Sequence, residues 1–303
     1  MASAGQEEHG RRADAPTART AAHRGAHTVG DALGGAVTAL AAAGCETPRL
    51  DAELLLAAVL DVGRERLLLD RELRVAGSSV RAFQDAVRRR AVDREPVAYI
   101  LGRRGFRRLE LAVDRRVLVP RPETELLVES VLEVPSGISV LEVGTGSGAV
   151  ALALKDERPD LEVTATDVSA EALEVARANG LRLDLDVGWL HADLLAGVPD
   201  AFDAVVANLP YVAESERFAL APEITRHEPA QALFAGADGL AAIAAMLAQL
   251  ESLPRVGLLA LEVGAGQSGA VAAMARTAGF QTVRSERDLA GIERVVLGQE
   301  RRR

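Results

Sequence analysis

From Ser139 to the end of the chain, short apolar runs alternate with stretches of helical periodicity, and this alternation constrains the fold more than any other feature. Alternation of this kind is typical of a parallel sheet with helices on both faces. We therefore predict an α/β fold with an open, seven-stranded, doubly wound sheet, whose ligands bind beyond the carboxyl ends of the strands. The predicted strands are residues 139–143, 161–166, 187–190, 203–207, 256–262, 281–285 and 293–297, and the predicted helices lie around 148–157, 169–179, 239–252 and 267–278.

The residues before the sheet change in composition along the chain. The first are rich in Ala, Arg, Gly and His and lack the apolar core of a signal peptide, which predicts a disordered tail. A stretch with helical periodicity follows. Apolar and charged residues then alternate over 103–119, which predicts a hairpin turning near Asp114 and Arg115. These features assign residues 1–28 to the tail, 29–98 to a helical domain, 99–119 to a hairpin linker and 120–300 to the domain that carries the sheet.

The composition argues against several classes of protein. Apolar residues make up 49% of the 303 residues, enough for a sizeable core, and the net charge of -9 argues against non-specific binding to nucleic acid. The one cysteine, Cys45, excludes an internal disulfide and a cysteine-based zinc cluster, and the five histidines lack metal-ligand spacing. No apolar run is long enough to span a membrane. We expect a cytoplasmic protein without a metal site, a membrane contact or a direct nucleic-acid partner.

A glycine-rich loop joins the first predicted strand of the sheet to the next helix. Glycine permits positive φ and close approach to a ligand, and the helix N-terminus offers free N–H groups. The spacing G-x-G-x-G differs from the dinucleotide fingerprint G-x-G-x-x-G. Glu142 would repel a pyrophosphate and favour a cation, such as the ammonium group of an amino acid. A tight turn without a ligand is the alternative. The candidate cofactor-binding residues here are Glu142, Gly144, Thr145, Gly146, Ser147 and Gly148.

Acidic residues follow the next two predicted strands. Asp167 can accept both hydroxyls of a ribose, or it can cap the helix that begins near Ser169. Asp193 can reach an adenine amine or cap a turn, and Leu194 can offer a backbone N–H and an apolar face to the base. Together with the glycine loop, these residues favour adenosine with a cationic amino-acid tail, which describes S-adenosylmethionine.

A second stretch resembles the glycine loop. "LEVGAGQSGAVAA" at 261–273 is similar to "LEVGTGSGAVALA" at 141–153, but it has an extra residue before Gly269. We interpret the second stretch as another strand-turn-helix unit and not as a second cofactor site.

The tetrapeptide Asn208-Leu209-Pro210-Tyr211 follows a buried strand and forms the candidate substrate site. A planar NH2 group is a poor nucleophile, and two acceptors gripping its hydrogens would orient it beside the cofactor methyl group. Asn208 can supply a side-chain oxygen and residue 209 a backbone carbonyl, while Tyr211 can stack on the flat group. We assign catalysis to Asn208, Pro210 and Tyr211, with Asn208 also bordering the cofactor. A proline-shaped turn with a capping asparagine is the alternative.

The chain resembles the PrmC/HemK family of S-adenosylmethionine-dependent methyltransferases, over roughly residues 30–298. The motifs that carry the resemblance are "LDAELLLAAVL", "EPVAYILGRRGF", "VLVPRPETELLVE", "LEVGTGSGAVALAL", "NLPYV" and "EPAQALFAGADGL". The resemblance implies methylation of the glutamine in the Gly-Gly-Gln motif of class I release factors. It also implies that residues 144–148 and Glu142 hold the methionine part of the cofactor, Asp167 the ribose and Leu194 the adenine. The helical domain would bind the release factor, and we expect a monomer.

Two positions depart from the family pattern. Leu209 replaces the first proline of the usual Asn-Pro-Pro-Tyr, which loosens the loop, and Asn-Leu-Pro-Tyr also resembles the motif of rRNA adenine dimethyltransferases. Arg107 follows Phe106 where the family often has another aromatic residue. The alternatives are therefore a methyltransferase of another protein or of an adenine amine in nucleic acid, and a non-catalytic paralogue that binds the cofactor. A nicotinamide-dependent oxidoreductase leaves Asn208 to Tyr211 unexplained.

Overall fold

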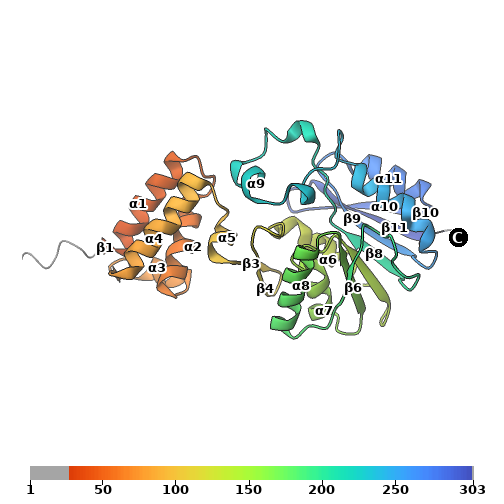
Figure 1. Cartoon of the computed structure of the whole chain (residues 1–303), viewed down its shortest axis with the longest axis horizontal. Coiled ribbons are helices and arrows are strands. Elements are labelled where there is room, and N and C mark those ends of the chain that lie inside the picture. Colours follow the sequence, from red (N-terminus) through yellow and green to blue (C-terminus); the bar gives the residue numbers. More distant parts are fainter. Residues whose placement is uncertain (1–26, 302–303) are drawn as a thin grey trace, which may run out of the picture. The chain divides into compact units, whose positions relative to one another are not determined.

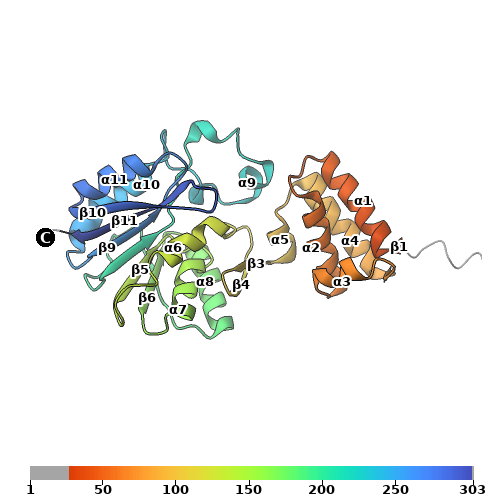
Figure 2. The same cartoon turned by 180° about the vertical axis from the view of Figure 1, so that it is seen from behind.

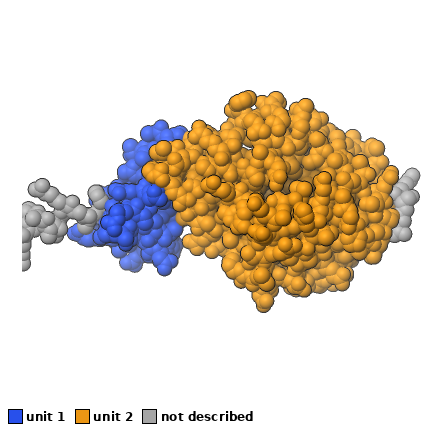
Figure 3. Space-filling model, viewed as in Figure 1, with its two compact units in different colours: residues 1–87 blue, residues 88–303 orange. Residues whose placement is uncertain are grey.

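The structure is a computed structural model that describes residues 27–301. Its contacts divide the chain into two compact units, residues 1–87 and 88–303 (Figure 3). Residues 1–26, which make up most of the expected tail, lie outside the described residues. No helix of the described part is both long and apolar enough to span a membrane.

The first unit is helical, as its periodicity predicts. Thr28 begins it: the Thr28 hydroxyl accepts from the Asp31 N–H at 3.1 Å, and the Asp31 carboxylate accepts from the Thr28 N–H at 3.2 Å, which forms a capping box. Leu40, Leu55 and Leu67 are fully buried in this unit. The elements are β1 (His27–Thr28), α1 (Val29–Ala42), α2 (Pro48–Leu60), α3 (Arg64–Leu69), β2 (Arg74–Val75) and α4 (Ser78–Arg88) (Figure 1). Helix α3, of six residues, was not predicted from the sequence, and β1 lies within the residues predicted as the tail.

The second unit begins at Arg88, about ten residues before the boundary between residues 98 and 99 that was predicted for the helical domain. A π-helical turn (Arg89–Asp93) and α5 (Val97–Leu101) belong to it. Arg90 and Arg94 donate to the two carboxylate oxygens of Glu223 at 2.9 and 2.6 Å. Glu223 lies on α9 (Pro222–His227) of the same unit. These ion pairs attach the end of the predicted helical domain to the second unit.

The hairpin turns earlier than predicted. Strands β3 (Arg103–Phe106) and β4 (Leu109–Ala112) pair with Phe106 opposite Leu109, so the turn lies at Arg107 and Arg108 and not at Asp114 and Arg115. Arg107 adopts a positive φ of 50°, and its guanidinium pairs with Glu129 and Glu157. The predicted turn does exist, because the Val117 N–H donates to the Asp114 carbonyl, but it joins no paired strands.

The sheet has seven strands in the order β10-β11-β9-β8-β5-β6-β7, which confirms the predicted strand number and the Rossmann-like architecture (Figures 1 and 2). Strands β5 to β9 are parallel, whereas β11 runs antiparallel to both β9 and β10. The prediction of a parallel sheet is therefore wrong for β11, which a turn and not a crossover helix joins to β10, whereas β10 runs in the same direction as β5 to β9. The bounds are β5 (Ser139–Val143), β6 (Glu162–Asp167), β7 (Gly188–His191), β8 (Ala204–Ala207), β9 (Leu258–Glu262), β10 (Phe280–Arg287) and β11 (Glu293–Arg301).

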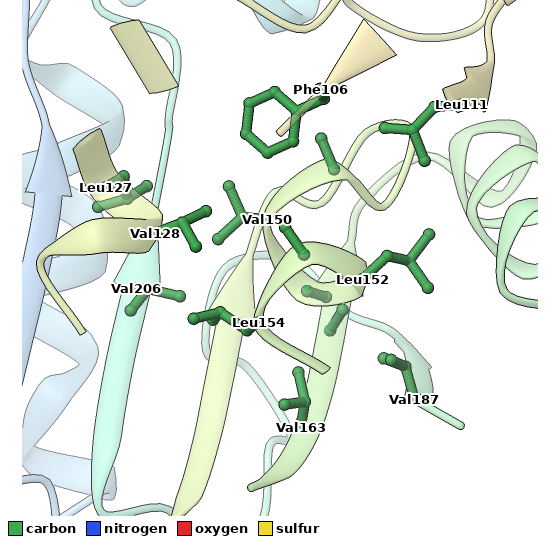
Figure 4. Close-up of a cluster of buried hydrophobic side chains, with 14 of the residues drawn as sticks. Phe106, Leu111, Leu127, Val128, Val150, Leu152, Leu154, Val163, Val187 and Val206 are labelled. Atoms are coloured by element: carbon green, nitrogen blue, oxygen red, sulfur yellow. The ribbon is translucent and has the colours of Figure 1, made fainter. Parts of the chain in front are cut away.

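Alternate residues of the buried strands face two core clusters. Val140, Val163 and Val206 belong to the first cluster, part of which is drawn in Figure 4. Leu141 and Val205 belong to the second. Side chains of α6 (Glu125–Glu129), α7 (Ala149–Glu157) and α8 (Ala170–Leu183) complete the first cluster, and those of α10 (Ala241–Gln249) and α11 (Ser268–Thr277) complete the second. Each large apolar side chain buried in this way contributes roughly 1.5–3 kcal/mol to the free energy of folding. The packed strands therefore hold the loops at their carboxyl ends in fixed positions.

Candidate active site

A cavity of about 430 Å³ opens where β5, β6, β7 and β8 end. Its size is typical of sites that hold one small organic ligand. The segment after the hairpin, which includes Leu118, Arg121 and Thr124, lines another part of the wall. The predicted residues that line the cavity are Glu142, Gly144, Thr145, Gly146, Ser147, Asp167, Asp193, Leu194, Asn208, Leu209 and Pro210, whereas Gly148 and Tyr211 are not among the lining residues.

The glycine loop needs its glycines for two different reasons. Gly144 and Gly146 border the cavity with φ of 76° and 56°, a conformation that side chains with a Cβ rarely adopt. Gly148 has a φ of 85° and faces the protein interior: a Cβ there would lie 2.9 Å from Leu152 Cδ1 and 3.2 Å from Trp189 Cη2. Gly148 therefore permits close packing at the start of α7. It was predicted to bind the cofactor, but it is not among the residues that line the cavity.

Asn179, which was not among the predicted site residues, supports the glycine loop through hydrogen bonds. Its Nδ2 donates to the Ser147 and Ala112 carbonyls, both at 3.0 Å, and its Oδ1 accepts from the Ala112 N–H at 2.8 Å. The residue is fully buried on α8. An asparagine on the apolar face of a predicted helix was the available signal, because buried polar side chains require partners. Asn179 thus ties the glycine loop to strand β4.

Glu142 lies one residue before the end of the buried strand β5, beside the cavity, and is 2% exposed. Its Oε2 accepts from the Thr145 hydroxyl at 2.6 Å and from the Ala151 N–H at 3.0 Å. Burial raises the pKa of Glu142 to about 8, against the lowering effect of these two donors. A cation in the cavity would favour the ionised form, because it would supply the charge partner that the buried carboxyl lacks.

Asp167 accepts hydrogen bonds from backbone N–H groups at both of its carboxylate oxygens. The Gly146 N–H donates to Oδ2 at 2.9 Å and the Ser169 N–H to Oδ1 at 2.8 Å. The capping alternative is wrong in detail, because Ser169 itself caps α8 and accepts from the Ala172 N–H at 3.1 Å. Burial raises the pKa of Asp167, whereas the backbone donors lower it. Asp167 lines the cavity and joins the glycine loop to the end of β6.

Asp193 and Leu194 lie together on the wall that follows β7. Asp193 is exposed, and its carbonyl accepts from the Ala196 N–H at 3.0 Å in a tight turn. Leu194 has a φ of 54°, which is rare for a residue with a branched side chain. Backbone strain of this kind is concentrated at ligand sites. Leu194 thereby presents an apolar side chain at the cavity.

Asn208 has one end of its amide already bonded. Its Nδ2 donates to the Thr124 hydroxyl at 3.1 Å. Because the donor end is held by Thr124, Oδ1 is the acceptor end that Asn208 offers at the cavity. Thr124 closes the "PRPET" segment and is buried, so a motif distant in the sequence orients the side chain.

The rest of the tetrapeptide divides between the cavity and the protein interior. Leu209 is 4% exposed and its side chain joins the second core cluster, close to Gly144. Pro210 lines the cavity. Tyr211 points elsewhere: its hydroxyl lies 3.4 Å from Glu262 Oε1. We expected Tyr211 to stack on a substrate group, but in this structure Tyr211 is not among the residues that line the cavity.

Two sequence motifs meet at the rim. Arg121 of "PRPETE" donates to Glu228 Oε1 at 2.6 Å, and the Val119 N–H donates to Glu228 Oε2 at 3.3 Å. Glu228, which begins "EPAQALFAGADGL", is 6% exposed. The ion pair joins the segment after the hairpin to the long connection between β8 and α10.

Comparison with known proteins identifies two family matches and close relatives. The family described as PrmC N-terminal domain matches residues 31–102, and the family described as Methyltransferase small domain matches residues 122–246. The release factor glutamine methyltransferase of Caulobacter vibrioides is 41% identical, over 84% of this chain and 91% of the relative. The enzymes of the same name from Deinococcus radiodurans and Moorella thermoacetica are 41% and 40% identical, over 88% and 90% of this chain and 96% and 99% of theirs.

Among solved structures, the hMettl16 catalytic domain in complex with MAT2A 3'UTR hairpin 6 is similar with a TM-score of 0.52. The match covers 75% of this chain and 84% of that chain at 13% sequence identity. At this identity the similarity concerns the fold alone.

Proposed function

Because the chain belongs to the release factor glutamine methyltransferase family, we propose that it methylates the side-chain amide nitrogen of a release-factor glutamine, using S-adenosylmethionine. The target we propose is the glutamine of the Gly-Gly-Gln motif in class I release factors. The observation that carries this proposal is Asn208, whose Nδ2 is held by Thr124, so that Oδ1 is left as an acceptor beside the cavity.

The residues around the cavity fit S-adenosylmethionine. When bound, this cofactor supplies a methyl group on a positively charged sulfur. Glu142 is a buried carboxyl whose ionised form a cation would stabilise, which suits the amino-acid end of the cofactor. Asp167 offers carboxylate oxygens for the ribose, while Asp193 and the strained Leu194 offer polar and apolar contacts for the adenine. The backbone of Gly144 and Gly146 permits close approach of the ligand.

The chain's contribution to the reaction is to orient a weak nucleophile. An amide nitrogen shares its lone pair with its carbonyl, so it reacts only when held in a favourable geometry. Asn208 Oδ1 accepts one N–H of the substrate amide, and the Leu209 carbonyl accepts the other. The transferred methyl group replaces one of the two amide hydrogens, which leaves as a proton after transfer, so no strong base is required. The Leu209 side chain is buried in the core and leaves the chemistry of this clamp unchanged.

We further propose roles for the parts of the chain outside the cavity. The helical unit, described here from residue 27 to 87, binds the release factor. The enzyme acts as a monomer in the cytoplasm, where release factors work, and it needs no nucleic acid.

The proposed function is tested by labelling. We expect the protein to transfer label from methyl-labelled S-adenosylmethionine to a class I release factor, but not to the same release factor carrying a Gln→Ala change in its Gly-Gly-Gln motif. Label that appears only in added RNA or DNA would contradict the proposal and favour an adenine substrate. Cofactor binding without label in any substrate would identify a non-catalytic paralogue.

The protonation state of Glu142 should depend on whether the cofactor is bound. Its pKa of about 8 means that the carboxyl is mostly protonated at pH 7 in the free protein. The cationic cofactor favours the ionised form, so binding at pH 7 should release up to about one proton per site, and this release should fade as the pH rises above the free-state pKa. Calorimetric titration in two buffers of different ionisation enthalpy measures the release. Glu142→Gln should abolish it, and equal release by the variant would contradict the assignment.

A further inference from the structure

Glu262 is a buried carboxyl that belongs to neither the proposed cofactor site nor the proposed substrate site. It ends β9 at 2% exposure, and its Oε2 is a buried side-chain oxygen without a hydrogen-bond partner among residues 27–301. Burying such an oxygen is unfavourable unless another requirement keeps it there. The position corresponds to Glu142 in the repeated sequence "LEVG", but it lies behind the tetrapeptide and does not line the cavity.

Glu262 lies next to Tyr211 and Thr124, which are neighbours of the two groups proposed to bind the substrate amide. The Tyr211 hydroxyl lies 3.4 Å from its Oε1, at the long end of hydrogen-bond distances. The Thr124 hydroxyl also interacts with this carboxyl and lowers its pKa. Since the Thr124 oxygen accepts from Asn208 Nδ2, its own hydrogen is available to the carboxylate. One carboxyl therefore lies next to the residue that orients Asn208 and to the residue that ends the tetrapeptide.

Gln267 holds the same tyrosine by its backbone. Its Nε2 donates to the Tyr211 carbonyl at 2.9 Å and to the Asp238 carbonyl at 3.3 Å, while its Oε1 accepts from the Gly264 N–H at 2.8 Å. Gln267 thus bridges the loop after β9 to the residue that follows Pro210. Tyr211 is fixed at its hydroxyl by Glu262 and at its carbonyl by Gln267.

We propose that Glu262 and Gln267 are positioning residues, which hold the Asn208 side chain and the Leu209 carbonyl in the geometry that grips the substrate amide. The proposal deepens the proposed function and rests on it for its kinetic consequences. It also gives the second "LEVG" repeat a use: where the first repeat borders the cofactor, the second supports the substrate clamp from behind.

The electrostatic surroundings agree with a carboxylate that accepts hydrogen bonds. The pKa of Glu262 is raised to about 7: burial and the nearby Glu123 carboxylate raise it, whereas the Thr124 and Tyr211 hydroxyls and the Arg294 guanidinium lower it. Each of the two hydroxyls therefore favours the ionised form that can accept from both of them.

The kinetic test compares Glu262→Leu, Glu262→Gln and Gln267→Ala with the wild type. We expect Glu262→Leu and Gln267→Ala to lower kcat by about 10- to 100-fold, as misplacing reacting groups does, with the Kd for S-adenosylmethionine changed less than about 3-fold. Glu262→Gln keeps one acceptor and should recover part of the lost kcat. Gln281→Ala and Glu286→Gln on the edge strand β10 are matched controls, expected to keep wild-type kcat.

Fluorine NMR provides a readout that does not depend on turnover. The chain has two tyrosines, so protein labelled with 3-fluorotyrosine gives two resonances, and Tyr99→Phe assigns them. We expect the Tyr211 resonance to shift or broaden in Glu262→Leu and Gln267→Ala and to stay unchanged in the two controls. An unchanged Tyr211 resonance, or wild-type kcat in both variants, would overturn the inference. Failure of the wild type to label a release factor would instead overturn the proposed function, and the NMR result would still decide the positions of these residues.

Discussion

Replacing Asn208 with alanine is expected to lower kcat by at least about 100-fold, the usual cost of removing a preorganised group that acts on the reacting atoms. The change removes the Oδ1 acceptor that grips the substrate amide, and it leaves the Thr124 hydroxyl without its donor. The contacts proposed for the amino-acid end and the ribose come from Glu142 and Asp167, so the Kd for S-adenosylmethionine should change little. Single-turnover methylation and a separate cofactor titration measure the two quantities.

Two further variants distinguish the loss of the Asn208 acceptor oxygen from the loss of the hydrogen bond that orients the Asn208 side chain. Asn208→Asp keeps an oxygen toward the substrate but loses the Nδ2 donor to Thr124, and Thr124→Val removes the partner while it keeps Asn208. Both should fall between the wild type and Asn208→Ala. If Asn208→Ala instead abolished cofactor binding, the main role of Asn208 would be in the cofactor site and the proposed clamp would be wrong.

Replacing Gly239 with alanine is expected to disrupt the site from a position outside the cavity. A Cβ on Gly239 would collide with the Tyr211 carbonyl oxygen and would lie 2.8 Å from the Tyr211 carbonyl carbon and 2.9 Å from Gln267 Nε2. Gly239 also has a φ of 76°. Collision and backbone strain together should cost about 3 kcal/mol or more. Because Tyr211 must move, methylation should fall by at least about 10-fold even in the folded fraction.

Gly291→Ala is the matched control for this prediction. Gly291 has a φ of 79°, but a Cβ there would meet no atom within 4 Å. The control should therefore show the cost of backbone strain alone, about 1–3 kcal/mol, with unchanged kcat in the folded protein. Calorimetric Tm and kcat per folded molecule are the measurements. Equal kcat per folded molecule in the two variants would mean that the displacement of Tyr211 has no consequence for the reaction.

The sequence predicted strands β5 and β8 well because both are short, largely apolar and buried runs. The predicted strand 139–143 coincides with β5, and the predicted strand 203–207 differs from β8 by one residue at its start. The predicted hairpin turn was wrong because Arg107 adopts a positive φ that its residue type does not suggest. The direction of β11 depends on which strands pair across the sheet, which local periodicity does not encode.

The candidate site was predictable where it depends on strand ends. Glu142 and Asp167 lie at the ends of parallel strands β5 and β6, Asn208 follows β8, and the ends of such strands meet at one edge. Partners that are distant in sequence were not predictable: Thr124 orients Asn208, and Glu262 lies against Tyr211. The side chain of Leu209 is a further example, because its burial in the core follows from the packing of the sheet and not from the tetrapeptide.

The pairing of Arg90 and Arg94 with Glu223 bears on how this family can recombine. Both arginines lie beyond the helical unit, yet they are encoded next to it and bind an acid more than a hundred residues away. An exchange of N-terminal units between relatives that crosses over after Arg94 would bring in foreign residues opposite Glu223, whose partly buried carboxylate would lose both guanidinium partners. A crossover before Arg88 leaves the pairs intact. The N-terminal unit that can be exchanged intact therefore ends where α4 ends, and not at the start of the hairpin.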